Sequence, residues 1–269
     1  MRPQSNKELF NYSLKLNQNK PIILFLPGFM GNLHAFEKII ALLESRFSYL
    51  AIDLCDRPPT QIEDKERLYN MENTAKALIK LLDSLKIKKC FLLGYSMGGR
   101  LALYLTIYFP HYFEKVILES ASAGLKTREA RNERLKKDLA LAQKLESSDL
   151  ASFLADWYRN PLFDSLKKYP DFSELIEERL KNDPFKLANS LRSLSVGSQP
   201  SLWEELKYNK IPTLLVVGEL DFKFIKINTE MRELCSSFQL VIVKGCGHNI
   251  HWENPQQFVN LIKKFLLES

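Results

Sequence analysis

The chain lacks long hydrophobic runs. None of its apolar stretches approaches the roughly 18 residues that a membrane-spanning helix requires. The first residues, MRPQSNKE, contain no apolar core of the kind found in signal peptides. We therefore expect a cytoplasmic protein that does not insert into membranes.

Cysteine and histidine are also scarce, with four of each in 269 residues. Cys55, Cys90, Cys235 and Cys246 form no Cys-x-x-Cys pair, which argues against a zinc site and against a secreted disulfide framework. No cluster of His, Cys, Asp and Glu has the spacing of metal ligands. The sequence therefore predicts free thiols, no metal and no organic cofactor.

Positive charge is in small excess and is dispersed. The chain has 38 Lys and Arg against 32 Asp and Glu, a formal net charge of +6. Most basic residues are mixed with acidic ones, and no basic stripe carries interleaved aromatic side chains, so nucleic acid is not an expected partner. A small anionic substrate is the remaining candidate partner. The sequence does not indicate an oligomeric state.

The most informative motif is GYSMG at residues 94–98. An apolar run, residues 90–93, precedes it, and apolar residues at helical spacing follow from Gly99. A Gly-x-Ser-x-Gly sequence between a strand and a helix is typical of a nucleophile elbow, in which a strained turn exposes the serine hydroxyl. The N–H of Met97 is then expected to point into the same space as the Ser96 hydroxyl. An ordinary glycine turn is the alternative for the pentapeptide alone.

The expected partners of Ser96 come later, in the chain order Ser, acid, His. Asp221 follows the apolar run 213–217, and His248 follows the run 240–243. Both residues lie past the carboxyl ends of predicted strands, where open α/β sheets place their ligands. Asp221 alone could be a helix N-cap, but the three positions together predict a Ser96–Asp221–His248 triad.

A second backbone donor is predicted near the start of the chain. Residues 22–26 have the pattern of a strand, and PGFMG at 27–31 follows. This sequence matches the loop that supplies one N–H of the oxyanion hole in α/β-hydrolases, so the amide of Phe29 is expected to pair with that of Met97. A plain turn at the end of the strand is the alternative.

Strand-like and helical segments alternate through the first 120 residues and again after Pro212. Such alternation predicts an α/β fold with a mostly parallel, doubly wound sheet. Between these parts, charged helical segments follow one another without a strand pattern. We therefore expect an α/β-hydrolase core of residues 1–126 and 209–269, with a helical cap inserted at residues 127–208.

With the elbow, the triad order, the oxyanion loop and the cap, the chain resembles the α/β-hydrolase superfamily over its full length. It is similar in particular to the 2-succinyl-6-hydroxy-2,4-cyclohexadiene-1-carboxylate synthases of menaquinone and phylloquinone biosynthesis. The closer match is carried by Arg100 and by residues 123–125, 153–158, 198–203, 218–224 and 247–251. One segment departs from the family pattern: DLCDRPP at 53–59 replaces Asp-Leu-Pro-Gly-His-Gly, which should reshape the pocket rim.

The resemblance implies a lyase that removes a ring proton and releases pyruvate from a substrate with three carboxylates. Arginine can bind carboxylates through two donors, which suits such a substrate. The resemblance assigns substrate binding to Tyr95, Arg100, Arg131, Arg134, Trp157 and Arg179. Arg100 lies one helical turn beyond Ser96, and Arg131 and Arg134 share a helix face. Surface ion pairs for the cap arginines, a cap-core role for Trp157 and Arg128 in place of Arg131 are the alternatives.

The leading hypothesis is therefore elimination of pyruvate by proton abstraction. Ser96 would take the proton with His248 as relay, Asp221 would fix the imidazole tautomer, and the amides of Phe29 and Met97 would hold the oxyanion. One alternative is a serine hydrolase that cleaves an ester or a carbon–carbon bond in a small acidic substrate. Another is a non-catalytic ligand-binding relative. The sequence does not separate the menaquinone from the phylloquinone route.

Overall fold

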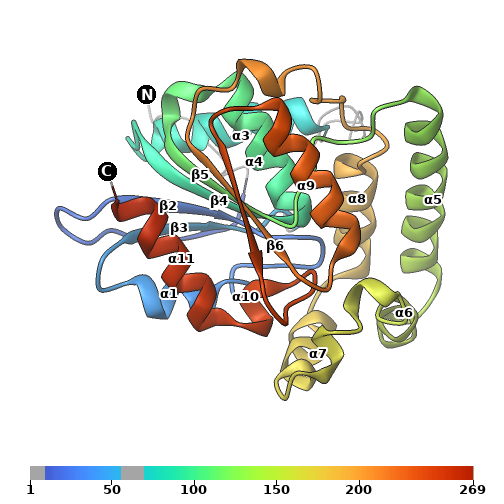
Figure 1. The fold of residues 1–269 in the computed structure, drawn as a ribbon. Coiled ribbons are helices and arrows are strands. Elements are labelled where there is room, and N and C mark those ends of the chain that lie inside the picture. Colours follow the sequence, from blue (N-terminus) through green and yellow to red (C-terminus); the bar gives the residue numbers. More distant parts are fainter. Residues whose placement is uncertain (1–9, 56–69, 269) are drawn as a thin grey trace, which may run out of the picture.

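A seven-stranded sheet forms the centre of the protein (Figure 1). The computed structural model describes residues 10–55 and 70–268. The strand order is β1–β3–β2–β4–β5–β6–β7, with β1 antiparallel to β3 and every other pair parallel. The mostly parallel α/β sheet is therefore confirmed. The strands are β1 (Tyr12–Lys15), β2 (Ile22–Leu26), β3 (Ser48–Ile52), β4 (Cys90–Tyr95), β5 (Phe113–Glu119), β6 (Thr213–Gly218) and β7 (Phe238–Val243).

Burial along the strands follows their position in the sheet. All residues of the interior strands β4 and β6 are buried, as their continuous apolar sequences predict for parallel strands covered on both faces. The edge strands β1 and β7 are partly exposed. Successive residues of β2 enter opposite faces: Leu24 and Leu26 join one hydrophobic cluster, and Ile23 and Phe25 join the other.

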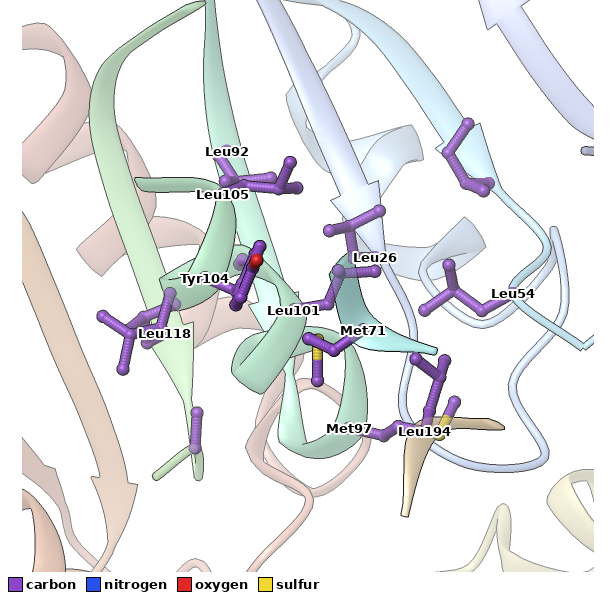
Figure 2. Close-up of a cluster of buried hydrophobic side chains, with 14 of the residues drawn as sticks. Leu26, Leu54, Met71, Leu92, Met97, Leu101, Tyr104, Leu105, Leu118 and Leu194 are labelled. Carbon is purple, nitrogen blue, oxygen red and sulfur yellow. The ribbon is translucent and has the colours of Figure 1, made fainter. Parts of the chain in front are cut away.

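Helices cover both faces of the sheet (Figure 1). Helices α1 (Glu37–Leu43) and α11 (Pro255–Leu267) pack on one face, and α3 (Met71–Ser84), α4 (Ser96–Tyr108) and α9 (Phe222–Leu234) pack on the other. Figure 2 shows the second of these layers, where Leu26, Leu92 and Leu118 of the sheet meet Leu101 and Leu105 of α4. The short helix α10 (Ile250–Glu253) precedes α11.

Between β5 and β6 the chain forms a separate group of helices (Figure 1). Its two connections are tied together: Leu202 N–H donates to the Ala123 carbonyl (2.8 Å), and the Trp203 indole N–H donates to the Gly124 carbonyl (2.9 Å). Residues 127 and 208 stay predicted limits of this cap. Its helices are α5 (Arg128–Ser147), α6 (Leu150–Trp157), α7 (Phe172–Leu180) and α8 (Pro184–Leu194). Three short 3-10 turns also lie between β5 and β6: η2 (Pro161–Phe163), η3 (Leu166–Lys168) and η4 (Leu206–Tyr208). A fourth, η1 (Pro110–Tyr112), joins α4 to β5 in the core.

Two further sequence expectations concern the altered loop at residues 53–59 and membrane insertion. Residues 56–59 of the altered loop at 53–59 lie outside the described residues. Among the helices of the described ranges, none combines the length and the apolar character needed to cross a bilayer.

The first turn of α4 packs directly on the end of β2. A Cβ atom on Gly98 would overlap the carbonyl oxygens of Leu26 and Pro27, which are backbone atoms and cannot rotate away. We expect Gly98→Ala to lower the free energy of unfolding by about 2–3 kcal/mol, although alanine is the better helix former. Urea unfolding followed by circular dichroism measures this change.

Gly245→Ala is the matched control. Its Cβ would meet nothing within 4 Å, so only the φ of +70° should cost stability, roughly 1–2 kcal/mol. Equal losses in the two variants would contradict the close-packing explanation.

Candidate active site

Ser96 lies at the junction of β4 and α4 with a φ of 48°, in the left-handed region. Residues other than glycine rarely adopt this backbone conformation, and such strain recurs at functional sites. Met97 follows in the first turn of α4, where a backbone N–H has no acceptor within the helix. The strand, strained turn and helix expected around residues 94–98 are thus present.

Ser96, His248 and Asp221 form one hydrogen-bonded chain. His248 Nε2 lies 3.1 Å from Ser96 Oγ, and His248 Nδ1 lies 2.6 Å from Asp221 Oδ2. His248 and Asp221 are buried. The second carboxylate oxygen of Asp221 accepts the N–H of Phe224 (3.2 Å). Asp221 is therefore both the N-cap of α9 and the partner of His248, so its two sequence interpretations hold together.

These contacts set the direction in which a proton can move. Because an ionised carboxylate only accepts hydrogen bonds, His248 Nδ1 carries its proton toward Asp221 and Nε2 presents its lone pair to Ser96. The rings of Phe224 and Tyr95 pack against the imidazole, with centroids 4.6 and 5.5 Å away. The site can therefore accept a proton through Ser96 and hold it on a shielded imidazole.

The loop after β2 supplies a second free amide. Gly31 N–H donates to the Gly28 carbonyl (3.0 Å) and closes a turn in which Met30 has a φ of 65°. Within the described ranges, the N–H groups of Phe29 and Met97 have no protein acceptor. Both residues line the same cavity as Ser96. The structure thus brings the two predicted oxyanion donors together.

A cavity of about 410 Å³ lies between the carboxyl ends of the central strands and the cap helices. This volume falls in the range of small-molecule sites. Asp221 lies behind His248 and does not line it. The predicted site residues that do line it are Phe29, Tyr95, Ser96, Met97, Arg100, Arg134, Trp157, Arg179 and His248.

Two arginines in the cavity wall have no carboxylate partner among the residues that the structure describes. Arg100 donates to the side-chain carbonyl of Gln199 (2.6 Å) and to the Leu194 carbonyl (2.8 Å). Arg179 is 5% exposed and donates to the Met30 carbonyl. Burial, and then a neighbouring arginine, lower the pKa of Arg100 to about 10, so it stays charged at neutral pH. Two cations with only neutral partners favour an anionic ligand.

The arginines of α5 differ in position. Arg134 lines the cavity, and its Nε lies 2.7 Å from Asp138 Oδ1. Arg131 does not line the cavity, contrary to expectation. Its guanidinium donates to the carbonyls of Leu125 (3.0 Å) and Lys126 (3.1 Å), just before α5, and these bonds hold it away. Arg128, the alternative to Arg131, does not line it either.

Trp157 and Tyr95 form aromatic walls. The Trp157 ring packs on Phe29 with centroids 5.2 Å apart and on Phe163 at 6.0 Å. Tyr95 is 7% exposed, and burial raises the pKa of its phenol well above the usual value. Trp157 therefore belongs both to the cap packing and to the cavity wall, and Tyr95 stays a neutral hydroxyl.

Sequence reasoning missed several polar side chains of the cavity. Asp138, which is 1% exposed, holds Arg134 and accepts the Ser195 hydroxyl (2.7 Å). Ser120 Oγ and Asn249 Oδ1 are buried in the wall and have no partner in the described part of the chain. The positions of Ser120 after β5 and of Asn249 beside the predicted histidine were available signals. Asp138 lies in a charged helix, α5, and no sequence signal distinguishes it from the other charged residues there.

Comparisons with known proteins agree with this geometry. A model of the alpha/beta hydrolase fold matches residues 21–255. A protein of Bacillus subtilis (strain 168), which bears the provisional name 2-succinyl-6-hydroxy-2,4-cyclohexadiene-1-carboxylate synthase, is 35% identical over 247 residues, 91% of this chain and 89% of that protein. The protein of that name from Serratia proteamaculans (strain 568) is 30% identical over 250 residues, 93% and 94% of the two chains.

A solved structure is also similar. The structure of MenH from S. aureus superposes with a TM-score of 0.88 at 31% identity, and the match covers 96% of this chain and 98% of that one. The family model spans most of the chain, and the relatives are similar along nearly their whole length. The chain therefore belongs to the α/β-hydrolase fold family and, within it, to the family of the 2-succinyl-6-hydroxy-2,4-cyclohexadiene-1-carboxylate synthases.

Proposed function

We propose that the protein is a carbon–oxygen lyase that eliminates pyruvate from a cyclohexene tricarboxylate and forms 2-succinyl-6-hydroxy-2,4-cyclohexadiene-1-carboxylate. The observation that carries this proposal is the union of two features in one cavity. The Ser96–His248 pair can move a proton, and Arg100 and Arg179 offer positive charge that no described carboxylate contacts directly. Family membership supports the same reaction and a role in menaquinone or phylloquinone biosynthesis.

In the proposed reaction Ser96 is the base. Its Oγ takes the ring proton while its own proton passes to His248 Nε2, 3.1 Å away, and Asp221 stabilises the resulting imidazolium. The electron pair of the broken C–H bond moves onto the succinyl carbonyl, whose oxyanion the amides of Phe29 and Met97 hold. When this electron pair moves back from the oxyanion, it forms a new double bond in the ring, and the carbon–oxygen bond between the ring and the enolpyruvyl group breaks. The departing enolate of pyruvate takes up the proton on its methylene carbon and becomes pyruvate.

Substrate binding depends on replacing water around the carboxylates. Moving such a group into a capped cavity is costly unless a cation and hydrogen-bond donors take the place of water. Arg100 is held in the cavity wall by two neutral acceptors, Gln199 and Leu194, and its pKa of about 10 keeps the charge. Arg134 already pairs with Asp138, so we assign it a weaker part.

The same residues could serve a serine hydrolase that acts on a small acidic substrate. A serine hydroxyl hydrogen-bonded to histidine, beside the backbone N–H groups of Phe29 and Met97, is also the arrangement needed for acyl transfer. In that reaction Ser96 would attack a carbonyl carbon and form an acyl-enzyme. In the lyase it removes a proton and forms no covalent bond to the substrate, so only the hydrolase proposal predicts a covalent intermediate that can be trapped.

Ser96→Ala, Asp221→Asn and His248→Ala should each lower turnover by several orders of magnitude and leave the fold intact. The three side chains act through one proton path, so the losses should be strongly non-additive. Pyruvate release from the family substrate, measured for single and double variants, tests this expectation. A double variant that loses the full product of the single effects would contradict a shared path.

Arg100→Ala should weaken the acidic substrate selectively. A carboxylate left without its cation should cost about 2–5 kcal/mol in transition-state stabilisation. Lysine at this position should restore only part of the loss, since it lacks the planar two-donor fork. Cleavage of a neutral p-nitrophenyl ester should barely change, because it needs no carboxylate ligand.

Arg192→Ala is the control for Arg100. Arg192 lies in α8, the helix whose Leu194 carbonyl accepts from Arg100, but it pairs with Glu146 (2.6 Å) and does not line the cavity. Both activities should survive in this variant. If Arg100→Ala slows the acidic and the neutral substrate equally, Arg100 is structural and the anionic-substrate proposal loses its main support.

Activity should not depend on a metal ion. The described ranges contain no group of three or more His, Cys, Asp or Glu side chains placed to hold one. The proposed oxyanion donors are backbone amides, which need no divalent ion. Turnover measured before and after dialysis against a chelator should agree; loss of activity that one divalent ion restores would overturn this prediction.

A further inference from the structure

The carbonyl of Met30, in the oxyanion loop, is held by the cap. Arg179 Nη1 donates to it, and Asn182 Nδ2 donates to it at 3.1 Å. Arg179 is in the last turn of α7, and Asn182 follows two residues after that helix ends. The same Asn182 amide also donates to the Arg179 carbonyl (3.1 Å), which joins the two donors to one another.

The position of this carbonyl matters because the loop is a tight turn. Met30 has a φ of 65°, an unfavourable conformation for a residue with a side chain. The peptide after Met30 donates back to Gly28, and Phe29 lies between these two residues. Fixing the Met30 carbonyl therefore fixes the turn, and with it the direction of the Phe29 N–H.

A second contact holds the loop from the same side. The Trp157 ring at the end of α6 packs on the Phe29 ring with centroids 5.2 Å apart. The cap thus contacts Phe29 through its side chain and the next residue through its backbone carbonyl. Met97, the other proposed oxyanion donor, belongs to the core helix α4. Its sulfur accepts the Ser190 hydroxyl of the cap (3.7 Å), but no charged cap side chain in the described ranges bonds to it.

We propose that Arg179 and Asn182 are positioning residues that set the Phe29 N–H through the Met30 carbonyl. The oxyanion hole is then complete only while the end of α7 is seated on the loop. This inference rests on the proposed role of Phe29 and Met97 as oxyanion donors, and it gives Arg179 a task besides contact with substrate. Asn182 separates the two tasks, because it reaches the same carbonyl but does not line the cavity.

The test measures Ser96 reactivity without the natural substrate. Sulfonylation of Ser96 by phenylmethanesulfonyl fluoride, a neutral reagent, is followed by intact mass for wild type, Asn182→Ala, Arg179→Met and Arg179→Lys. Ser96→Ala gives the background. Asn182→Ala should slow labelling about two- to tenfold, the range of one neutral hydrogen bond. Arg179→Met should slow it by about ten- to a hundredfold, short of losing an oxyanion donor outright, and lysine should recover part of this.

Lys181→Ala is the matched control, since the exposed Lys181 lies between the two residues and pairs only with the partly exposed Glu178 among the described residues. It should label at the wild-type rate. The proposal requires slower labelling in both Asn182→Ala and Arg179→Met at unchanged melting temperature; wild-type labelling by either variant overturns it. With the acidic substrate, Asn182→Ala should lower kcat and leave KM unchanged.

The two proposals fail in different ways. If the protein does not release pyruvate, the lyase assignment is wrong, but the labelling rates still report on the loop. If pyruvate is released and the Asn182 and Arg179 variants label normally, the lyase stands and the positioning role is wrong.

Discussion

The strained turn at Ser96 is the constraint on which the rest of the site depends. A serine at a φ of 48° is held there because β4 is buried in the middle of the sheet and the first turn of α4 packs on the carbonyls at the end of β2. This one junction places the Ser96 hydroxyl, frees the Met97 amide and carries Arg100 one turn further along the same helix. The core therefore fixes the proposed proton-transfer group, one proposed oxyanion donor and one cation relative to each other.

The cap supplies the rest of the cavity wall. It contributes Arg134, Arg179 and Trp157 to the cavity wall, and the Gln199 and Leu194 carbonyls that orient Arg100. The buried Arg179 and the partly exposed Arg100 each donate to at least one neutral carbonyl, and the pKa of Arg100, about 10, keeps that guanidinium charged for a ligand. A hydrolase of neutral esters would gain nothing from this arrangement, whereas a polyanionic substrate requires it.

Local motifs and chain order were sufficient to predict the core of the site. GYSMG at 94–98 has a fixed strand–turn–helix context. Asp221 follows the buried strand β6 and His248 follows the neighbouring edge strand β7, so the sheet itself brings them together. The parallel sheet follows from the alternation of strands and helices. The direction of β1 does not, because the short sequence YSLK carries no signal for its antiparallel pairing with β3.

Contacts between the cap and the core could not be predicted in the same way. Arg179 and Met30 are 149 residues apart, and their contact depends on how α7 is seated. Helical spacing placed Arg131 and Arg134 on one face but could not tell that the carbonyls of Leu125 and Lys126, just before α5, would hold Arg131. Long cationic side chains take the acceptors that the tertiary structure offers, and sequence spacing does not describe those acceptors.

The most direct test of the central claim is to incubate the purified protein with the family's tricarboxylate substrate and to follow pyruvate release beside cleavage of a neutral p-nitrophenyl ester. The account predicts one pyruvate per molecule of ring product, a much higher kcat/KM for the acidic substrate, and no acyl-enzyme detectable by intact mass. Ester cleavage through an accumulating acyl-enzyme on Ser96, without pyruvate release, would contradict it.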